Sequence, residues 1–201
     1  MFDSASPAER SAQSKDQSRV LWILLSINAV MFVAEIIAGI VAESTGLMAD
    51  SLDMLADATV YAIGLYAVGK AVSVKARAAL MSGIFQILLA LGVAAEVARR
   101  LLFGSEPEAL IMIGVSMIAL LANIVCLVLI SKHRDGEVHM RASWIFSKND
   151  VIANVGVIFA GILVYVLASP LPDLVIGALI SLIVLRGGVS IVTDARLEKA
   201  G

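Results

Sequence analysis

Residues 46–68 read GLMADSLDMLADATVYAIGLYAV, an apolar stretch long enough to cross a membrane that nevertheless carries three aspartates. Asp50, Asp53 and Asp57 recur at i, i+3 and i+7, a spacing that puts them on one face of an α-helix. A carboxylate at the centre of a membrane helix costs about 3 kcal/mol or more, and carboxylates in one stripe also repel one another. Cations or protons, or the two in turn, are the partners that would stabilise such a stripe. The stretch therefore predicts a functional membrane helix.

The composition is that of a membrane protein. Of the 201 residues, 60% are hydrophobic and only 5% are aromatic, and the mean hydropathy is +0.94. A soluble domain is usually about 45–50% apolar. The net charge is −2, and no basic stretch is suited to nucleic acid, so nucleic-acid binding is excluded.

Six apolar segments follow one another, each close to the ~20 residues that span the hydrocarbon core. Short connections between them predict an all-α, six-transmembrane-helix bundle that forms one domain over residues 20–193. Residues 1–19 are polar and of mixed charge, and we expect a disordered tail there; residues 194–201 are expected to form a short C-terminal tail. The segments are 20–41, 47–69, 79–101, 108–131, 144–168 and 172–193.

Local signals mark one helix boundary and the orientation. Residues 105–108, Ser-Glu-Pro-Glu, resemble a capping box with proline in the first turn of the fourth helix. Eleven of the 15 Lys and Arg residues flank one side of the predicted spans, whereas only Arg99 and Arg100 flank the other. The positive-inside rule then predicts a multi-pass protein of the cell membrane with both termini in the cytoplasm.

The fifth apolar segment carries polar groups that match those of the second. Asp150 and Asn154 are four residues apart and share a helix face. At 1.5 Å per residue, Asp57 and Asn154 each lie ~15 Å into the membrane from opposite sides. We therefore expect the second and fifth segments to bring their polar groups together near the midplane, as an oxygen-lined cation site.

Other polar residues lie inside apolar segments. Glu35, and Asn149 in the fifth segment, are candidates for a proton relay or for polar contacts in the bundle interior. Asn123 is a polar residue within the fourth segment. Glu96 is three and four residues before Arg99 and Arg100, which predicts an ion pair at the membrane interface.

Two segments resemble the cation diffusion facilitator (cation efflux) family. LMADSLDMLADA (47–58) is similar to the family's second helix, and RASWIFSKNDVIANVGVI (141–158) is similar to its fifth. The resemblance implies that Asp53 and Asp57 bind the transported divalent metal, that Asp150 is the aspartate of the fifth helix, and that Asp50 is a further acidic position one turn earlier.

The sequence departs from the family pattern at the other fifth-helix ligand, where it has Phe146, which cannot bind metal. Asn154 or Asn149 is the expected replacement through its amide oxygen. An all-oxygen ligand set favours Mn²⁺, Fe²⁺ or Mg²⁺-like ions over Zn²⁺. The cytosolic C-terminal domain that many members carry is not expected, so the resemblance is to a short form with the transmembrane domain only.

The resemblance implies a secondary transporter, not an enzyme, that exports a divalent metal such as zinc, manganese, cobalt or iron from the cytoplasm. The resemblance also implies proton antiport, and the chemistry is compatible with it, because clustered carboxylates in a low dielectric take up protons when the metal is absent. The partners are then the metal ion as substrate, protons and the lipid bilayer, with no other cofactor. A homodimer through the small residues Gly177 and Ser181 is a further expectation.

Two alternatives stay open. Phe146 and the absent C-terminal domain also fit a non-transporting membrane scaffold or a partner-dependent subunit of the same fold. An intramembrane aspartyl protease fits less well, because its dyad needs two acids rather than three on one helix and one on another.

Overall fold

The chain forms six α-helices in a computed structural model that describes residues 7–67, 72–132 and 138–200. These ranges contain no β-strand, and the predicted all-α fold of six helices is confirmed. The helices are α1 (Pro7–Val41), α2 (Thr45–Ala67), α3 (Val72–Phe103), α4 (Ala109–Ser131), α5 (Val138–Leu167) and α6 (Leu171–Ala200).

Five of the helices, all except α2, are long and apolar enough to cross a membrane. Every 18-residue stretch of α2 includes Asp50, Asp53 and Asp57, and this charge distinguishes it from the other five. Large apolar side chains such as Leu88 and Leu121 are 62% and 64% exposed, as expected of helix surfaces that face lipid. The protein is thus a polytopic membrane bundle in which one helix, α2, carries three acids within its apolar stretch.

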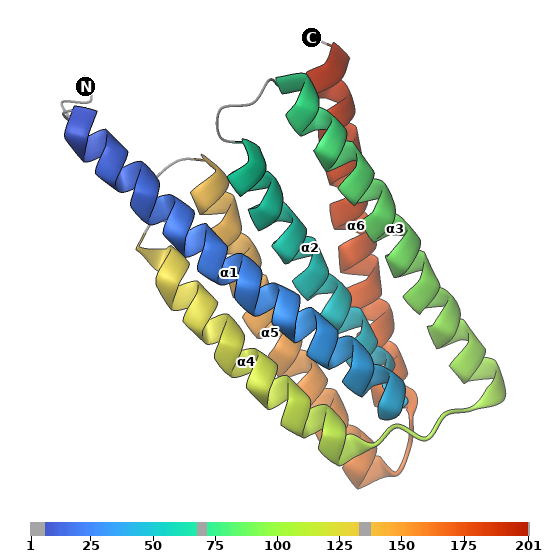
Figure 1. Cartoon of the computed structure of the whole chain (residues 1–201). Helices are drawn as coiled ribbons and strands as arrows, with labels where there is room; N and C mark the ends of the chain where they lie inside the picture. Colours follow the sequence, from blue (N-terminus) through green and yellow to red (C-terminus); the bar gives the residue numbers. More distant parts are fainter. Residues whose placement is uncertain (1–6, 68–71, 133–137, 201) are drawn as a thin grey trace.

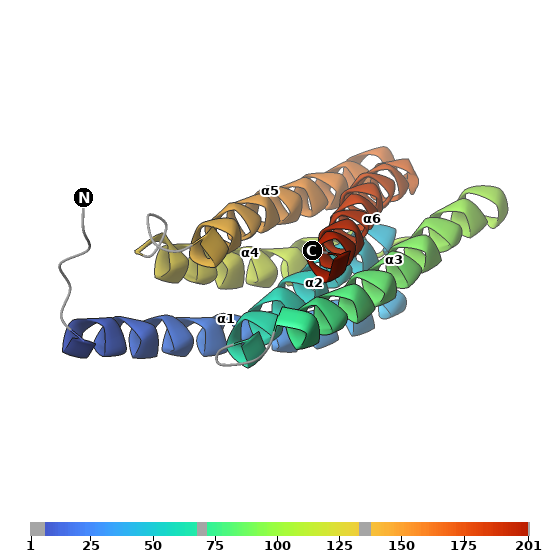
Figure 2. The same ribbon diagram turned by 90° about the horizontal axis from the view of Figure 1, so that it is seen from above.

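The helices fall into two groups. α1, α2, α4 and α5 lie together, whereas α3 packs along α6 at one side of the bundle (Figures 1 and 2). Within the described part of the chain, α2 is the only helix that contacts all five others. The start of α1 and the end of α6 lie at the same end of the bundle (Figure 1). We call this end the terminal end and the other the opposite end.

The α3–α6 pair is held by close backbone approach and by polar contacts. A Cβ atom on Gly83 would lie 3.0 Å from the carbonyl oxygen of Gly188, so the two helices meet where neither has a side chain. The side chain of Gln86 donates to the carbonyl of Val184 at 3.0 Å. These contacts fix α3 and α6 as one unit.

Gly177 and Ser181, the residues predicted for a dimer contact, are both used within the chain, whereas the homodimer itself stays a prediction. A Cβ atom on Gly177 would lie 2.7 Å from the hydroxyl oxygen of Thr45, so this glycine lets α6 approach α2. The buried hydroxyl of Ser181 donates to the carbonyl of Ala90 in α3 at 2.8 Å. A stripe of small residues serves close packing equally well inside one chain.

Helical structure extends beyond the predicted spans. Residues 7–19 continue α1 instead of forming the disordered tail predicted for residues 1–19. Pro7 lies in the first turn, where its missing N–H breaks no helical bond, and the next residues include good helix formers. Gln17 is buried, so this segment packs before the apolar stretch begins. Residues 1–6 of the predicted tail lie outside the described residues. α6 likewise continues to Ala200, through most of the predicted C-terminal tail.

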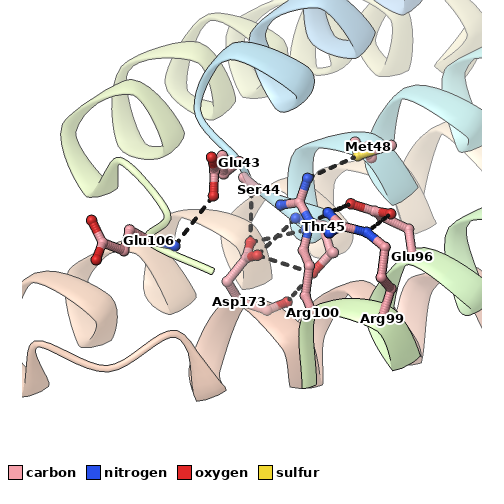
Figure 3. Close-up of polar contacts among 10 residues, drawn as sticks. Glu43, Ser44, Thr45, Met48, Glu96, Arg99, Arg100, Glu106 and Asp173 are labelled. Carbon is pink, nitrogen blue, oxygen red and sulfur yellow. Dashed lines mark hydrogen bonds and ion pairs between the residues drawn. The ribbon is translucent and has the colours of Figure 1, made fainter. Parts of the chain in front are cut away.

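The predicted capping box before α4 does not form. The helix begins at Ala109, and its N-cap residue Glu108 makes no side-chain capping bond. The backbone N–H of Glu108 instead donates to the carbonyl of Ala42 at 2.9 Å, and that of Glu106 donates to the Glu43 carboxylate at 3.4 Å (Figure 3). The segment therefore bonds to the turn between α1 and α2 rather than winding into a helical turn.

Asp173 in the first turn of α6 caps the N-terminus of α2 (Figure 3). Its carboxylate accepts the backbone N–H groups of Thr45 at 2.7 Å and Gly46 at 2.9 Å, and also the hydroxyl of Ser44 at 2.6 Å. Asp173 is fully buried. An aspartate at a helix N-terminus satisfies backbone donors that would otherwise be unpaired, so this one contact sets where α2 starts relative to α6.

Replacing Asp173 with alanine should lower the stability of the folded protein by about 2 kcal/mol or more, because several buried donors lose their acceptor. Thermal unfolding of the purified protein in detergent measures the effect. Asp194→Ala is the matched control, since Asp194 is an exposed aspartate of the same helix. Equal unfolding midpoints for the two variants would show that the cap does not stabilise the bundle.

Candidate metal centre

The acidic stripe of α2 points into the bundle. Asp50 is 1% exposed and Asp57 is 4% exposed, while Asp53 between them is partly buried. The i, i+3, i+7 spacing puts the three side chains on one face because an α-helix has 3.6 residues per turn. The same stripe continues one turn further, to Tyr61.

α5 contributes Ser147, Asp150 and Asn154, all buried and each about one helical turn from the next. Lys148 and Asn149 are exposed. The prediction that Asn149 lies in the bundle interior or donates an oxygen to the site is therefore wrong. One residue of helix corresponds to a rotation of about 100°, which turns Asn149 outward while Asp150 points inward.

The Asp150 carboxyl lies against the carboxyls of Asp53 and Asp57 and interacts directly with both. Its atom Oδ2 is buried and has no hydrogen-bond partner. The structure thus brings together the two α2 aspartates and the α5 aspartate that the sequence singles out. An unpartnered carboxylate oxygen in this position is available to a further ligand.

Asp50 and Asn154 belong to a separate chain of hydrogen bonds. The amide of Asn154 donates to Asp50 Oδ2 at 2.6 Å and accepts at its own Oδ1 from Asn123 of α4 at 2.9 Å. All three side chains are buried. The amide oxygen of Asn154 is therefore already occupied, and Asn154 links α4 to α2.

Glu35 of α1 lies in the bundle interior with no exposed surface. Neither of its carboxylate oxygens has a hydrogen-bond partner. It lies close enough to Asp50 and Asp53 for their charges to repel. α1 therefore adds the carboxyl of Glu35 beside the acidic stripe of α2.

Tyr61 and Ser147 are polar partners of the site that the sequence did not suggest. The Tyr61 hydroxyl donates to Asp57 Oδ2 at 2.7 Å and lies 3.2 Å from the Ser147 hydroxyl. A tyrosine in an apolar helix is usually an ordinary core residue. The available signal was its position, four residues after Asp57 on the same stripe.

Among the described residues, the acidic side chains by themselves do not form a complete metal site. Within the ranges that the structure describes, no three His, Cys, Asp or Glu side chains form a group that could hold a metal ion by themselves. A hydroxyl group bonds to Asp57 and an amide group bonds to Asp50. A cation held by this region must therefore draw on oxygens of several kinds.

At the opposite end of the bundle, Glu96 pairs with both neighbouring arginines, and the predicted ion pair is confirmed (Figure 3). Arg99 Nη2 is 2.7 Å and Arg100 Nε is 2.6 Å from Glu96 Oε1. Arg100 is buried and also reaches the sulfur of Met48 in the first turn of α2, at 3.8 Å. These charges lie beside the N-terminus of α2, several residues from the acidic stripe.

Known proteins with similar sequences are bacterial metal transporters. The metal cation efflux system protein CzcD of Cupriavidus metallidurans is 27% identical over 179 residues, which cover 83% of this chain and 57% of CzcD. The zinc transporter ZitB of Pectobacterium atrosepticum is 28% identical over 200 residues, which cover 91% of this chain and 61% of ZitB. The chain thus spans about three fifths of the length of these relatives.

The family comparison covers most of the sequence. Residues 21–198 match the model of the cation efflux transmembrane domain. This range includes all of the acidic and amide residues of the candidate site and confirms the family that the second and fifth apolar segments predict. The chain is therefore a member of the cation diffusion facilitator, or cation efflux, family.

Proposed function

We propose that this protein is a secondary transporter that exports a divalent metal ion from the cytoplasm in exchange for protons. The observation that carries the proposal is the contact of Asp150 on α5 with Asp53 and Asp57 on α2, inside the bundle. The named relatives are a metal cation efflux protein and a zinc transporter, neither of them an enzyme.

The metal ligands in this proposal are Asp53, Asp57 and Asp150. A divalent ion balances the charge of carboxylates that would otherwise repel in a low dielectric. Asp150 Oδ2 has no protein partner and is free to bind it. Since the three acids do not close around one point, water or hydroxyl oxygens complete the coordination. This all-oxygen set favours Mn²⁺, Fe²⁺ or Mg²⁺-like ions over Zn²⁺.

Asp50 and Asn154 support the site from the adjacent turn. The 2.6 Å bond from Asn154 occupies one oxygen of Asp50, and Asn123 occupies the amide oxygen of Asn154. In this arrangement Asn154 orients Asp50 and would bind the metal directly only after leaving Asn123. Hydrogen-bonded partners of this kind commonly set the geometry and affinity of a metal site.

Protons take the place of the metal in the other half of the cycle. Carboxylates in contact inside a membrane need either a cation or a proton between them. Metal binding therefore releases protons, and metal release takes them up. Glu35, buried and without a partner beside Asp50 and Asp53, is the proposed proton carrier. The two flows are coupled if access to the site alternates between the two membrane faces.

The proposed direction follows from the charge distribution. Most Lys and Arg residues flank the spans on the side of the terminal end, and by the positive-inside rule this distribution supports a cytoplasmic location for that end and both termini. The metal then enters between α2 and α5 from the terminal end and leaves toward the end where Asp173 caps α2.

A partner-dependent or non-transporting role is the second candidate. It is favoured by the absence, within the described ranges, of three clustered ligand side chains, and by Phe146, which has no donor atom. A protein that needs another subunit to complete its site would give no metal flux by itself.

Replacing Asp57 or Asp150 with asparagine should abolish transport, because each change removes one charge that balances the ion. The expected loss of metal affinity is at least about a hundredfold, or about 3 kcal/mol. The measurement is flux of Zn²⁺, Mn²⁺, Co²⁺, Fe²⁺ and Cd²⁺ into proteoliposomes that contain only this protein, under an imposed pH gradient.

The matched control is Asp194→Asn, which removes a charge from an exposed position of α6. Full flux in either site variant would overturn the ligand assignment. Folded wild-type protein that moves none of the five ions would favour the partner-dependent role.

Glu35→Gln should uncouple the flow of metal from the flow of protons. Glutamine keeps the shape of the side chain, but its amide cannot take up or release a proton. Metal binding should change little, whereas the protons moved per metal ion should fall. A pH-sensitive dye inside the proteoliposomes reports the protons alongside the metal flux. Glu108→Gln, at an exposed glutamate, is the control. An unchanged ratio of protons to metal would remove Glu35 from the proposed proton pathway.

Asn154→Ala should change transport more than Asn149→Ala, although both remove an asparagine amide from α5. Asn154 is buried and holds Asp50, whereas Asn149 is exposed. Loss of a hydrogen-bonded partner of a metal site typically lowers affinity by about 10- to 100-fold. Metal flux measured against metal concentration gives the apparent affinity, and equal values for the two variants would reduce Asn154 to a packing residue.

A further inference from the structure

Tyr61 occupies an unusual place for a tyrosine in a membrane helix. Its side chain is 1% exposed and lies one turn after Asp57, at the side of the acidic stripe toward the terminal end. Apolar neighbours such as Leu24 and Ile130 pack around it. A buried tyrosine in such surroundings needs a partner for its hydroxyl, and here that partner is a proposed metal ligand.

The Tyr61 hydroxyl joins α2 to α5. It donates its proton to Asp57 Oδ2 over 2.7 Å, so the Ser147 hydroxyl at 3.2 Å must be the donor to the tyrosine oxygen. Ser147 is fully buried and lies one turn before Asp150. The two hydroxyls therefore form a short chain that ends on Asp57.

This chain occupies one oxygen of Asp57, while the Asp57 carboxyl also interacts with Asp150. Oδ2 accepts the tyrosine proton, whereas the carboxyl also faces Asp150, whose own Oδ2 has no partner. The bond takes up one of the two lone pairs of Oδ2 and fixes the plane of the carboxyl, so the other oxygen is the one better placed to bind a cation. The carboxyl also cannot rotate to present both oxygens without breaking the bond to Tyr61.

We infer that Tyr61, braced by Ser147, is a positioning residue of the metal site that restricts Asp57 to binding through a single oxygen. The inference rests on the proposed function in taking Asp57 as a ligand.

Binding through single oxygens affects which ions fit. Small divalent ions such as Mn²⁺ and Mg²⁺ prefer six ligands in near-octahedral geometry, whereas Ca²⁺ takes six to eight oxygens and readily accepts both oxygens of one carboxylate. Restricting Asp57 therefore discriminates against the larger ion. Removal of the restriction should narrow the difference in affinity between Mn²⁺ and Ca²⁺.

The test is equilibrium binding of Mn²⁺ to the purified full-length protein in detergent, measured by the EPR signal of free Mn²⁺, with Ca²⁺ as competitor. Tyr61→Phe removes only the hydroxyl. We expect the preference for Mn²⁺ over Ca²⁺ to fall about tenfold, the lower end of the usual effect of losing a partner of a metal ligand. A tyrosine that serves stability alone would lower the unfolding temperature and leave this ratio unchanged.

Tyr165→Phe is the matched control, because Tyr165 is 69% exposed on α5. Ser147→Ala removes only the hydroxyl that bonds to Tyr61, and it should shift the preference for Mn²⁺ over Ca²⁺ in the same direction. The double variant should resemble Tyr61→Phe, because both hydroxyls act through the bond from Tyr61 to Asp57. If Tyr61→Phe does not fold, Ser147→Ala carries the test by itself.

The inference would be overturned if folded Tyr61→Phe protein kept the wild-type preference for Mn²⁺ over Ca²⁺. If Tyr61→Phe does not fold, an unchanged preference in Ser147→Ala would overturn it. The readout does not depend on transport. Wild-type protein that binds Mn²⁺ with the expected response to Tyr61→Phe but shows no flux supports the positioning role and contradicts the transport proposal. Wild-type protein that binds neither ion contradicts both.

Discussion

The burial of four aspartates at the contact of two membrane helices is the constraint on which the rest of this structure depends. Asp50, Asp57 and Asp150 have almost no exposed surface, and Asp53 is only partly exposed. Charges in this position are stable only with partners of opposite charge, with protons or with strong hydrogen-bond donors. The other polar residues of the bundle interior are best understood as answers to that requirement: amides beside Asp50, hydroxyls beside Asp57, and an open oxygen on Asp150.

The arrangement of the helices serves the same constraint. α2 contacts every other helix within the described ranges, so its acidic face is shielded from lipid on all sides. The five helices around it present large apolar side chains outward and buried polar groups such as Glu35, Asn123 and Asp150 inward. The close pairing of α3 with α6 through Gly83 and Gly188 provides a firm side wall, and α1, α4 and α5 complete the enclosure. A helix as polar as α2 could not otherwise occupy a membrane.

The sequence alone predicts the helix count, the polar helix and the α5 aspartate, because apolar length and helical spacing are local properties. It predicts that α2 and α5 meet, but it does not predict the hydrogen bonds made by Asp173 and Ser147. Asp173 is 128 residues from the Thr45 backbone N–H that it accepts, and Ser147 is 86 residues from Tyr61. The same limit applies to two other predictions. Asn149 and Asp150 are adjacent in the sequence, and only the packing of α5 decides which of the two points inward. The spacing of Gly177 and Ser181 fits a contact with a partner chain as well as it fits their packing against α2 and α3.

The cap that Asp173 provides has a mechanical consequence. When a helix is bonded to a neighbour at its first residues and tilts about that attachment, the displacement is largest at its other end. α1 shares that attachment, because only a short turn separates it from α2. Displacements of these two helices relative to α6 therefore grow with distance from Asp173. They are smallest beside the Glu96–arginine cluster and largest near Tyr61 and beyond, so the two ends of the bundle differ in how easily they can separate.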